Sequence, residues 1–289
     1  NTGGKYDSNV FQKSVGLNGV GTKAVNALSE KFTIESIRAN KSIKLSFSQG
    51  EKNNEENIPH TSSRNGTIVE FTPDSSIFKK YRFIEEYVES QILYYVYLNS
   101  GLNINFNGRK YESENGLKDL LEKNTENQKI AYPIIHLKGN DIEVAITHGY
   151  QYGEEYYSFV NGQHTTHGGT HLAAFRESVV KTLRDYYKKD FEPSDIRASI
   201  ISTISIRIQN PIFESQTKTK LGSTELTEDG LTVRIFINDF IKNSLDNYLH
   251  KHPDIAELIL KRILQSEKER KALAGIKKIA NQRAKTANL

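Results

Sequence analysis

The stretch Val15-Gly16-Leu17-Asn18-Gly19-Val20-Gly21-Thr22-Lys23-Ala24-Val25-Asn26-Ala27-Leu28-Ser29 has the pattern of a glycine-rich loop that runs directly into a helix. The first turn of a helix leaves backbone N–H groups without intrahelical partners and carries a partial positive charge. Glycines let such a backbone approach a bulky anion closely, so the stretch is a candidate phosphate cradle. An ordinary glycine-containing turn before a core helix is the alternative interpretation.

Two well-known phosphate-binding patterns do not fit this stretch. The P-loop requires a lysine directly after its last glycine, and Thr22 stands at that place. The dinucleotide fingerprint orders its glycines as Gly-x-Gly-x-x-Gly after a strand, whereas Gly16, Gly19 and Gly21 have the reverse order and follow polar residues. The glycine order therefore points to a different kind of phosphate loop.

Composition narrows the class of protein. The 289 residues carry a net charge of +4 and 10% aromatic residues, which favours a globular chain, and the length favours two domains. The mild positive charge is compatible with a polyanionic partner without requiring one. Because the chain has no cysteine, disulfides, thiolate metal sites and a cysteine nucleophile are excluded. No apolar run approaches the roughly 20 residues that span a bilayer and no signal-peptide pattern opens the chain, so we expect a cytoplasmic location.

Residue periodicity predicts the elements of the first half. Alternation of apolar and polar residues predicts strands over 32–37, 43–47, 66–73 and 102–106, the last followed by a turn at Asn107-Gly108. Helical spacing predicts helices over 20–29, 82–99 and 116–123, with Ile84, Val88, Ile92 and Val96 of the second one facing the core. We expect a loop over 49–65 and a domain boundary in the polar stretch 124–128.

The second half predicts a different architecture. A strand pair is expected over 142–148 and 155–160, a helix over 170–188 and a long alternating strand over 200–208, an order that implies a right-handed crossover. Further helices are expected over 234–248 and 254–287. In the last helix we expect Ile259, Ile263, Leu273, Ile276 and Ala280 to be buried and Lys261, Arg262, Lys268, Arg270, Lys271, Lys277, Lys278, Arg283 and Lys285 to point mostly outward. This basic surface is either a DNA-facing surface or a solvated face.

Three histidines, His164, His167 and His171, surround the pair Gly168-Gly169 and raise the question of a zinc site. Metal-binding histidines need a rigid face and further ligands, but glycines interrupt this run and no carboxylate or cysteine completes a shell. We therefore expect no metal ligands here, and we interpret the segment as a glycine loop that starts the helix at 170.

The reversed glycine order carries a family resemblance. Gly16-Leu17-Asn18-Gly19-Val20-Gly21, preceded by Gly3-Gly4-Lys5-Tyr6, resembles the ATP-lid motif of the B subunits of bacterial type IIA DNA topoisomerases, members of the GHKL ATPase group. Asn18, where these bacterial proteins usually have histidine, and the following Thr22-Lys23 favour the topoisomerase IV branch over gyrase. The resemblance implies that ATP is contacted by Gly4, Lys5, Gly16, Leu17, Asn18, Gly19, Val20 and Gly21; considered as isolated lysines, Lys5 and Lys13 would be solvated surface residues.

Further matches follow in the family's order along the chain. The segment Gly66–Pro73 resembles the strand whose threonine, here Thr67, hydrogen-bonds near the adenine, and Gly168–Arg176 resembles the opening of the family's transducer helix. The segment Phe213–Leu221 resembles the loop that reaches back to the ATPase domain. This resemblance implies that Gln216 and Lys218 bind the γ-phosphate, where a mobile ammonium gains most. Asp195-Ile196-Arg197 resembles an Asp-x-Arg segment of the family, with a surface ion pair as the alternative.

The resemblance spans nearly the whole chain and implies an α+β fold. Residues 1–126 would be the C-terminal part of a GHKL ATPase α/β sandwich, and residues 127–289 a transducer domain with a right-handed βαβ crossover and a long last helix. In this family ATP binding dimerises two B subunits into a gate that traps a DNA duplex, hydrolysis resets the gate, and the A subunit cleaves and rejoins DNA. The implied cofactors are ATP and Mg²⁺, and the implied partners are DNA, an A subunit and a second B subunit, with no membrane.

Several residues of the family machinery are not in this sequence. The general-base glutamate, the magnesium-binding asparagine and the adenine pocket of the family lie upstream of the lid, and the absence of methionine together with the opening Asn1-Thr2-Gly3-Gly4 suggests a piece of a longer protein. We therefore expect the chain alone to be inactive. Hydrolysis well above background that Lys218→Ala abolishes would contradict this.

Two other classes of protein remain as alternatives. One is a MutL-type mismatch-repair ATPase or a heat-shock chaperone, which shares the lid. The other is a non-enzymatic DNA-binding scaffold, which predicts salt-dependent DNA binding without any effect of nucleotide.

Overall fold

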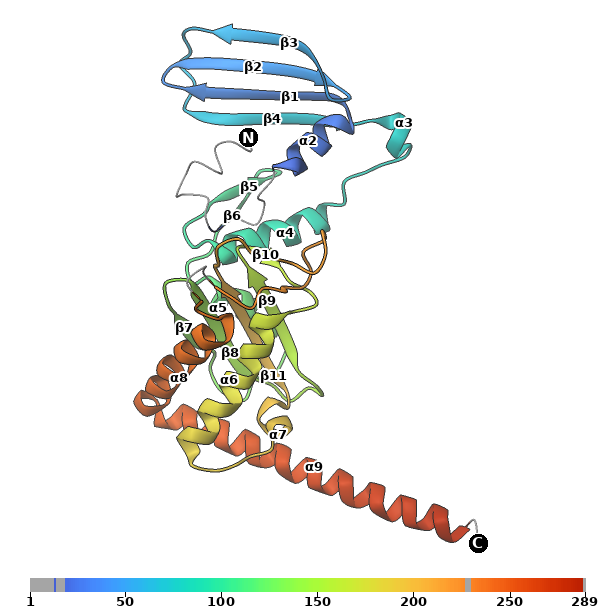
Figure 1. The fold of residues 1–289 in the computed structure, drawn as a ribbon, viewed down its shortest axis with the longest axis vertical. Helices are drawn as coiled ribbons and strands as arrows, with labels where there is room; N and C mark the ends of the chain where they lie inside the picture. Colours follow the sequence, from blue (N-terminus) through green and yellow to red (C-terminus); the bar gives the residue numbers. More distant parts are fainter. Residues whose placement is uncertain (1–12, 14–18, 227–229, 288–289) are drawn as a thin grey trace. The chain divides into compact units, whose positions relative to one another are not determined.

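The computed structural model describes residues 13, 19–226 and 230–287, and the side chains of 277–287 are outside this description. The chain divides into two compact units, with the described part of the first covering 19–88 and that of the second covering Lys13 and 89–287 (Figure 1). Helices and strands are both abundant in the described residues, which confirms the α+β class. The predicted boundary between residues 126 and 127, which would separate an ATPase domain from a transducer domain, stays a prediction.

The first unit is built on a four-stranded antiparallel sheet in the order β3-β2-β1-β4. β1 and β2 form a hairpin whose turn residues, Ala39 and Asn40, both have left-handed φ angles, of 50° and 61°. This is the turn geometry that matches the right-handed twist of paired strands. The elements are α2 (Val20–Ala27), β1 (Ser29–Arg38), β2 (Lys41–Ser48), β3 (Glu51–Ile58), β4 (Gly66–Pro73) and α3 (Ser75–Phe78).

Strand β3 corrects the loop predicted over 49–65. Its residues read Glu-Lys-Asn-Asn-Glu-Glu-Asn-Ile, and every one of them is exposed. Such a strand has no apolar alternation, because it lies at the edge of the sheet and is held by backbone pairing with β2. The strands predicted over 32–37, 43–47 and 66–73 are confirmed as parts of β1, β2 and β4.

The second unit contains a five-stranded sheet in the order β10-β9-β11-β8-β7. β9 and β11 run parallel and are connected through α6 and α7, which is the predicted crossover. The strands predicted at 142–148 and 155–160 exist as β8 and β9. Because β11 lies between them, the prediction that they pair with each other was wrong. The elements are α4 (Glu85–Leu98), which begins in the first unit, β5 (Ile104–Phe106), β6 (Arg109–Tyr111), α5 (Leu117–Thr125), β7 (Ile135–Lys138), β8 (Ile142–His148), β9 (Glu155–Val160), β10 (Gln163–His164), α6 (Thr170–Tyr187), α7 (Pro193–Arg197), β11 (Ile200–Ile206), α8 (Val233–Lys251) and α9 (Pro253–Ala287).

The core of the second unit lies between the sheet and the helices α6, α8 and α9. α6 and α8 pack side by side against one side of the sheet (Figure 1). α5 contacts β7, β8 and β11, and neighbouring residues Val144 and Ala145 of β8 are both fully buried, so both sides of the sheet are covered. β11 is therefore buried along almost its whole length instead of alternating, and it includes the buried polar residues Ser202 and Thr203.

Among the described side chains of the long helix α9, the buried ones lie in its first half. Ile255, Ile259 and Ile263 are buried in the core, whereas Leu273 and Ile276, which the sequence predicts to be buried, are 62% and 65% exposed. The helix extends past the body of its unit, where helical spacing of apolar residues no longer means burial (Figure 1). Of the helices in the described residues, none combines the length and the apolar content that a membrane span needs.

Helix α8 begins at a capping residue whose contribution can be measured. The Oγ1 of Thr232 accepts a hydrogen bond from the backbone N–H of Ile235 at 3.1 Å. Because this satisfies an N–H group that the helix leaves without a partner, we expect Thr232→Ala to lower the free energy of unfolding by about 1 kcal/mol. Urea unfolding measures this loss, and Thr232→Ser, which keeps the hydroxyl, is the control. Equal losses in the two variants would contradict the capping role.

Candidate functional site

The residues Gln216 and Lys218 lie at the tip of a hairpin formed by residues 212–223. The backbone N–H of Lys218 donates to the carbonyl of Ser215 at 3.0 Å, which closes a four-residue turn around Gln216 and Thr217. The hydroxyls of Ser215 and Thr217 lie 2.7 Å apart, and Lys218 follows the turn with a left-handed φ of 57°. Gln216 is exposed and Lys218 is half-buried, so both residues lie on a tip whose backbone has a defined shape.

The base of this hairpin is anchored in the core of the second unit. Phe213 and Leu221 form an antiparallel bridge, and the N–H of Gly222 donates to the carbonyl of Ile212 at 2.9 Å. Leu221 is 1% exposed and belongs to the main hydrophobic cluster. A buried anchor at its base therefore supports the exposed tip.

The segment predicted to open the transducer helix contacts this hairpin directly. α6 begins at Thr170, whose N–H donates to the carbonyl of Leu221 at 3.2 Å and whose hydroxyl donates to the carbonyl of Ser223 at 2.6 Å. The structure thus brings together two segments that the sequence analysis treats as separate matches. They lie about 50 residues apart in sequence, and no local pattern indicates that they touch.

The three histidines around this segment have different environments. His171 is fully buried, with its Nε2 3.2 Å from the hydroxyl of Thr165, and burial lowers its pKa to about 3. His164 stacks on Phe159 with 4.9 Å between ring centroids, while His167 is exposed. Within the described residues, no group of three or more histidine or acidic side chains is arranged to hold a metal ion.

Only part of the glycine-rich loop can be placed. Gly4, Lys5, Gly16, Leu17 and Asn18 lie outside the described residues. Gly19 precedes α2 with a left-handed φ of 61°, and α2 has no buried residue. Val20 is 54% exposed, and a Cβ added at Gly21 would meet no atom within 4 Å. The start of α2 is therefore open, as a loop that contacts a ligand requires.

Two other predicted residues are also located. Thr67 lies in β4 opposite Ser36 of β1 and is exposed. Lys13, one of the two isolated lysines considered, is exposed at the surface, as expected, and pairs there with Asp141 at 2.6 Å.

The Asp195-Ile196-Arg197 segment is part of α7, and its charged residues pair with other segments: Asp195 with Arg270 and Arg197 with Glu154. Asp195 is 3% exposed and accepts two hydrogen bonds from Arg270 of α9, at 2.7 and 2.8 Å. Arg262 of α9, which the sequence predicts to point outward, is 7% exposed and donates to Ser199 at 2.6 Å. Two of the basic residues of α9 therefore fasten the helix to its own unit: Arg270 bonds α7, and Arg262 bonds the residue before β11.

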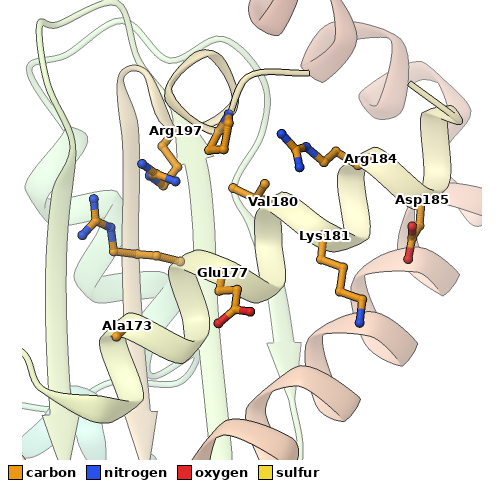
Figure 2. Close-up of a pocket in the computed structure, with 9 residues that line it drawn as sticks. Ala173, Glu177, Val180, Lys181, Arg184, Asp185 and Arg197 are labelled. Atoms are coloured by element: carbon orange, nitrogen blue, oxygen red, sulfur yellow. The ribbon is translucent and has the colours of Figure 1, made fainter. Parts of the chain in front are cut away.

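A pocket of about 610 Å³ lies between α6 and α7 (Figure 2). Arg184, Lys181 and Arg197 line it together with acidic residues, and Arg197 pairs with Glu154 at 3.2 Å. Burial opposes the ionisation of Glu154, but a hydrogen bond from Tyr156 and the charges of two arginines outweigh it, so its pKa is lowered. None of the residues predicted to contact a nucleotide lines this pocket, and its charges are of both signs. We assign it no part in the candidate site.

Comparison with known proteins gives consistent matches. The family model described as DNA gyrase B matches residues 116–278. The B subunit of DNA topoisomerase 4 from Borreliella burgdorferi is 43% identical over 285 residues, which are 99% of this chain and 46% of that protein. The B subunit of DNA gyrase from Helicobacter pylori (strain 26695) is 32% identical over 292 residues, 93% of this chain and 37% of that protein. The chain therefore spans about half or less of the length of these curated relatives.

Solved structures share the fold. The 43K ATPase domain of Thermus thermophilus gyrase B, in complex with an aminocoumarin, superposes with a TM-score of 0.72 at 26% identity and covers 90% of this chain and 75% of that chain. The ATPase region of Saccharomyces cerevisiae topoisomerase II matches in fold with a TM-score of 0.64 at 21% identity, over 83% of this chain and 65% of that chain.

Proposed function

This chain belongs to the DNA gyrase B family, the B subunits of type IIA DNA topoisomerases, and on that premise we propose that it is the ATPase and transducer region of such a protein. In the proposed reaction, ATP binding closes two B subunits around a DNA duplex and hydrolysis reopens them. An A subunit cleaves and rejoins the second duplex. The topoisomerase and ATPase names of the related proteins support this assignment, and a cytoplasmic location would go with it.

The observation that carries the proposal is the hairpin tip. We propose that Lys218 binds the terminal phosphate of ATP and stabilises the charge that develops there, with Gln216 beside it. An ammonium held in place before the reaction acts most strongly where negative charge increases. The turn at Ser215–Lys218 and the buried Leu221 supply the required backbone order. Gly4, Lys5 and the residues from Gly16 to Gly21 would surround the phosphates, and Thr67 would contact the adenine side.

The described residues fit a nucleotide in part and do not by themselves fit Mg²⁺. The lysine on the ordered tip of the second unit suits an anionic ligand, and the open helix start of the first unit, taken by itself, does so too. Within the described residues, no group of three or more histidine or acidic side chains is arranged to hold a metal ion. Bound Mg²⁺ would neutralise phosphate charge. We assign no residue of this chain to that ion.

The alternatives are less well supported. The family match over 116–278 does not favour a MutL-type ATPase or a chaperone, and it does not favour a scaffold without activity. Within the family we propose the topoisomerase IV branch, because identity to the B subunit of a topoisomerase 4 is 43% and identity to the B subunit of a gyrase is 32%.

Strand passage by the full-length subunit tests this function. The full-length subunit that contains this chain, combined with its A subunit, is expected to separate interlinked DNA circles only when ATP is supplied. The amount of released circles, measured by gel electrophoresis, should rise with ATP and stay at background without it. Decatenation that proceeds equally without nucleotide, or salt-dependent DNA binding with no strand passage, would overturn the proposal.

A further inference from the structure

The hairpin that carries Lys218 is joined to the turn before α6 by backbone hydrogen bonds at two places. The N–H of Leu221 donates to the carbonyl of Gly168 at 3.0 Å, and Gly169 and Leu221 form a parallel bridge. Nearer the tip, the N–H of His167 donates to the carbonyl of Thr219 at 2.9 Å. The turn at residues 167–170, here called the seat, therefore follows the returning arm of the hairpin up to the residue next to Lys218.

A residue with a side chain does not fit at position 169 of the seat. Its φ of +133° is a conformation that residues with a side chain rarely adopt. A Cβ at this position would lie 2.4 Å from the carbonyl oxygen of Leu221 and 2.5 Å from its nitrogen. Both atoms belong to the backbone of the hairpin, so a side chain at Gly169 would force the hairpin away from the seat.

His167 adds a side-chain contact at the tip. Its Nδ1 lies 3.1 Å from the hydroxyl of Thr219, and the ring is exposed at the surface. Thr219 is bonded to Lys218, whose left-handed φ of 57° fixes the direction in which its side chain leaves the backbone. The position of the Thr219 backbone therefore determines where the side chain of Lys218 begins.

We propose that His167 and Gly169 are positioning residues that set where Lys218 is presented to the nucleotide. This inference rests on the proposed function, because it assumes that Lys218 acts on ATP. The seat contacts themselves do not depend on that assumption, so they can be tested separately. A displacement of about 1 Å of a catalytic group is enough to cost a large factor in rate.

The first experiment measures the tip in the 289-residue chain without nucleotide. The chain has no cysteine, so Thr217→Cys and Lys181→Cys introduce the only two labelling positions for pulsed electron paramagnetic resonance. In the doubly labelled parent chain we expect a narrow distribution of the distance between the labels at positions 217 and 181. Adding His167→Ala or Gly169→Ala should broaden and shift this distribution. Gly162→Ala is the matched control, because Gly162 also has a positive φ, of +84°, but an added Cβ there would meet no atom within 4 Å.

The second experiment measures ATP hydrolysis by the full-length subunit. We expect Gly169→Ala to lower kcat on the order of 10-fold with KM nearly unchanged, because positioning and not binding is disturbed. His167→Ala should have a smaller effect of the same kind. His167→Gln, which keeps a hydrogen-bonding group toward Thr219, should restore both the distance distribution and kcat.

The outcomes separate the two proposals. If the unsubstituted subunit does not hydrolyse ATP, the proposed function fails before any variant is compared. If the distance distribution is unchanged in both His167→Ala and Gly169→Ala, the seat does not hold the tip in place and the proposal fails. If the tip moves but kcat is unchanged, the position of the tip does not govern hydrolysis and the positioning role fails. Should Gly169→Ala fail to fold, His167→Ala still decides the matter, because His167 is exposed and outside the core.

Discussion

Lys218→Ala is expected to reduce kcat for ATP hydrolysis by the full-length subunit about 10²- to 10³-fold, the usual cost of removing one preorganised group that stabilises transition-state charge. The KM for ATP should change much less, because the proposed interaction strengthens as the terminal phosphate gains charge. The tip geometry supports this: the turn closed by the Lys218 N–H at 3.0 Å from the Ser215 carbonyl holds the backbone in one shape. Steady-state hydrolysis at varied ATP concentration measures both constants.

A neighbouring lysine provides the matched control. Lys220 lies on the same hairpin, carries the same charge and pairs with Glu214 at 2.8 Å. If general positive charge at the hairpin were sufficient, Lys220→Ala and Lys218→Ala would slow hydrolysis equally. We expect Lys220→Ala to retain nearly full kcat. Similar losses in both variants would contradict the role assigned to Lys218.

Local periodicity predicts those strands whose sequence alternates between apolar and polar residues. The sequences of β1, β2 and β4 alternate in this way, although β4 has no buried residue. The Asn107-Gly108 turn between β5 and β6 has both residues at positive φ, as such turns require. β3 could not be found this way, because an edge strand with every side chain exposed carries no apolar signal. The burial of β11 on both sides, and its place between β8 and β9, follow from tertiary packing that the local pattern does not contain.

The candidate site depended on resemblance more than on pattern. As a bare sequence, Gln216-Thr217-Lys218 is a polar loop, and only the match to a family motif indicated a ligand. The contact between Gly169 and Leu221 could not be predicted, because a glycine beside another glycine indicates freedom of the backbone but not which segment approaches it. Arg262 was wrongly expected outside, since helical spacing does not reveal that Ser199 and Gly149 offer oxygen atoms at its position.

Acid is expected to destabilise the second unit through its buried histidines. His148 is 1% exposed; the hydroxyl of Tyr132 donates to its Nδ1, and its Nε2–H donates to the carbonyl of Ile196 at 2.7 Å. Burial, with a contribution from the charge of Arg262, lowers its pKa to about 4, and burial lowers the pKa of His171 to about 3. In the unfolded chain both rings protonate near pH 6.5. Between pH 6.5 and 4 the unfolded state therefore binds more protons, and the unfolding free energy falls as the pH falls.

Each histidine should remove about 3 kcal/mol from the unfolding free energy between pH 7 and pH 4, because one pKa unit corresponds to about 1.4 kcal/mol. Urea unfolding at several pH values measures this loss. In His148→Gln the free energy of unfolding should fall between pH 7 and pH 4 by about 3 kcal/mol less than it does in the parent chain. Tyr132→Phe is the control: it removes a hydrogen bond but leaves the ring buried, so it should cost about 1 kcal/mol at every pH and leave the pH dependence in place. If His148→Gln retained the full pH dependence, proton uptake by this ring would not contribute, and the loss of stability in acid would have to come from other groups, among them His171.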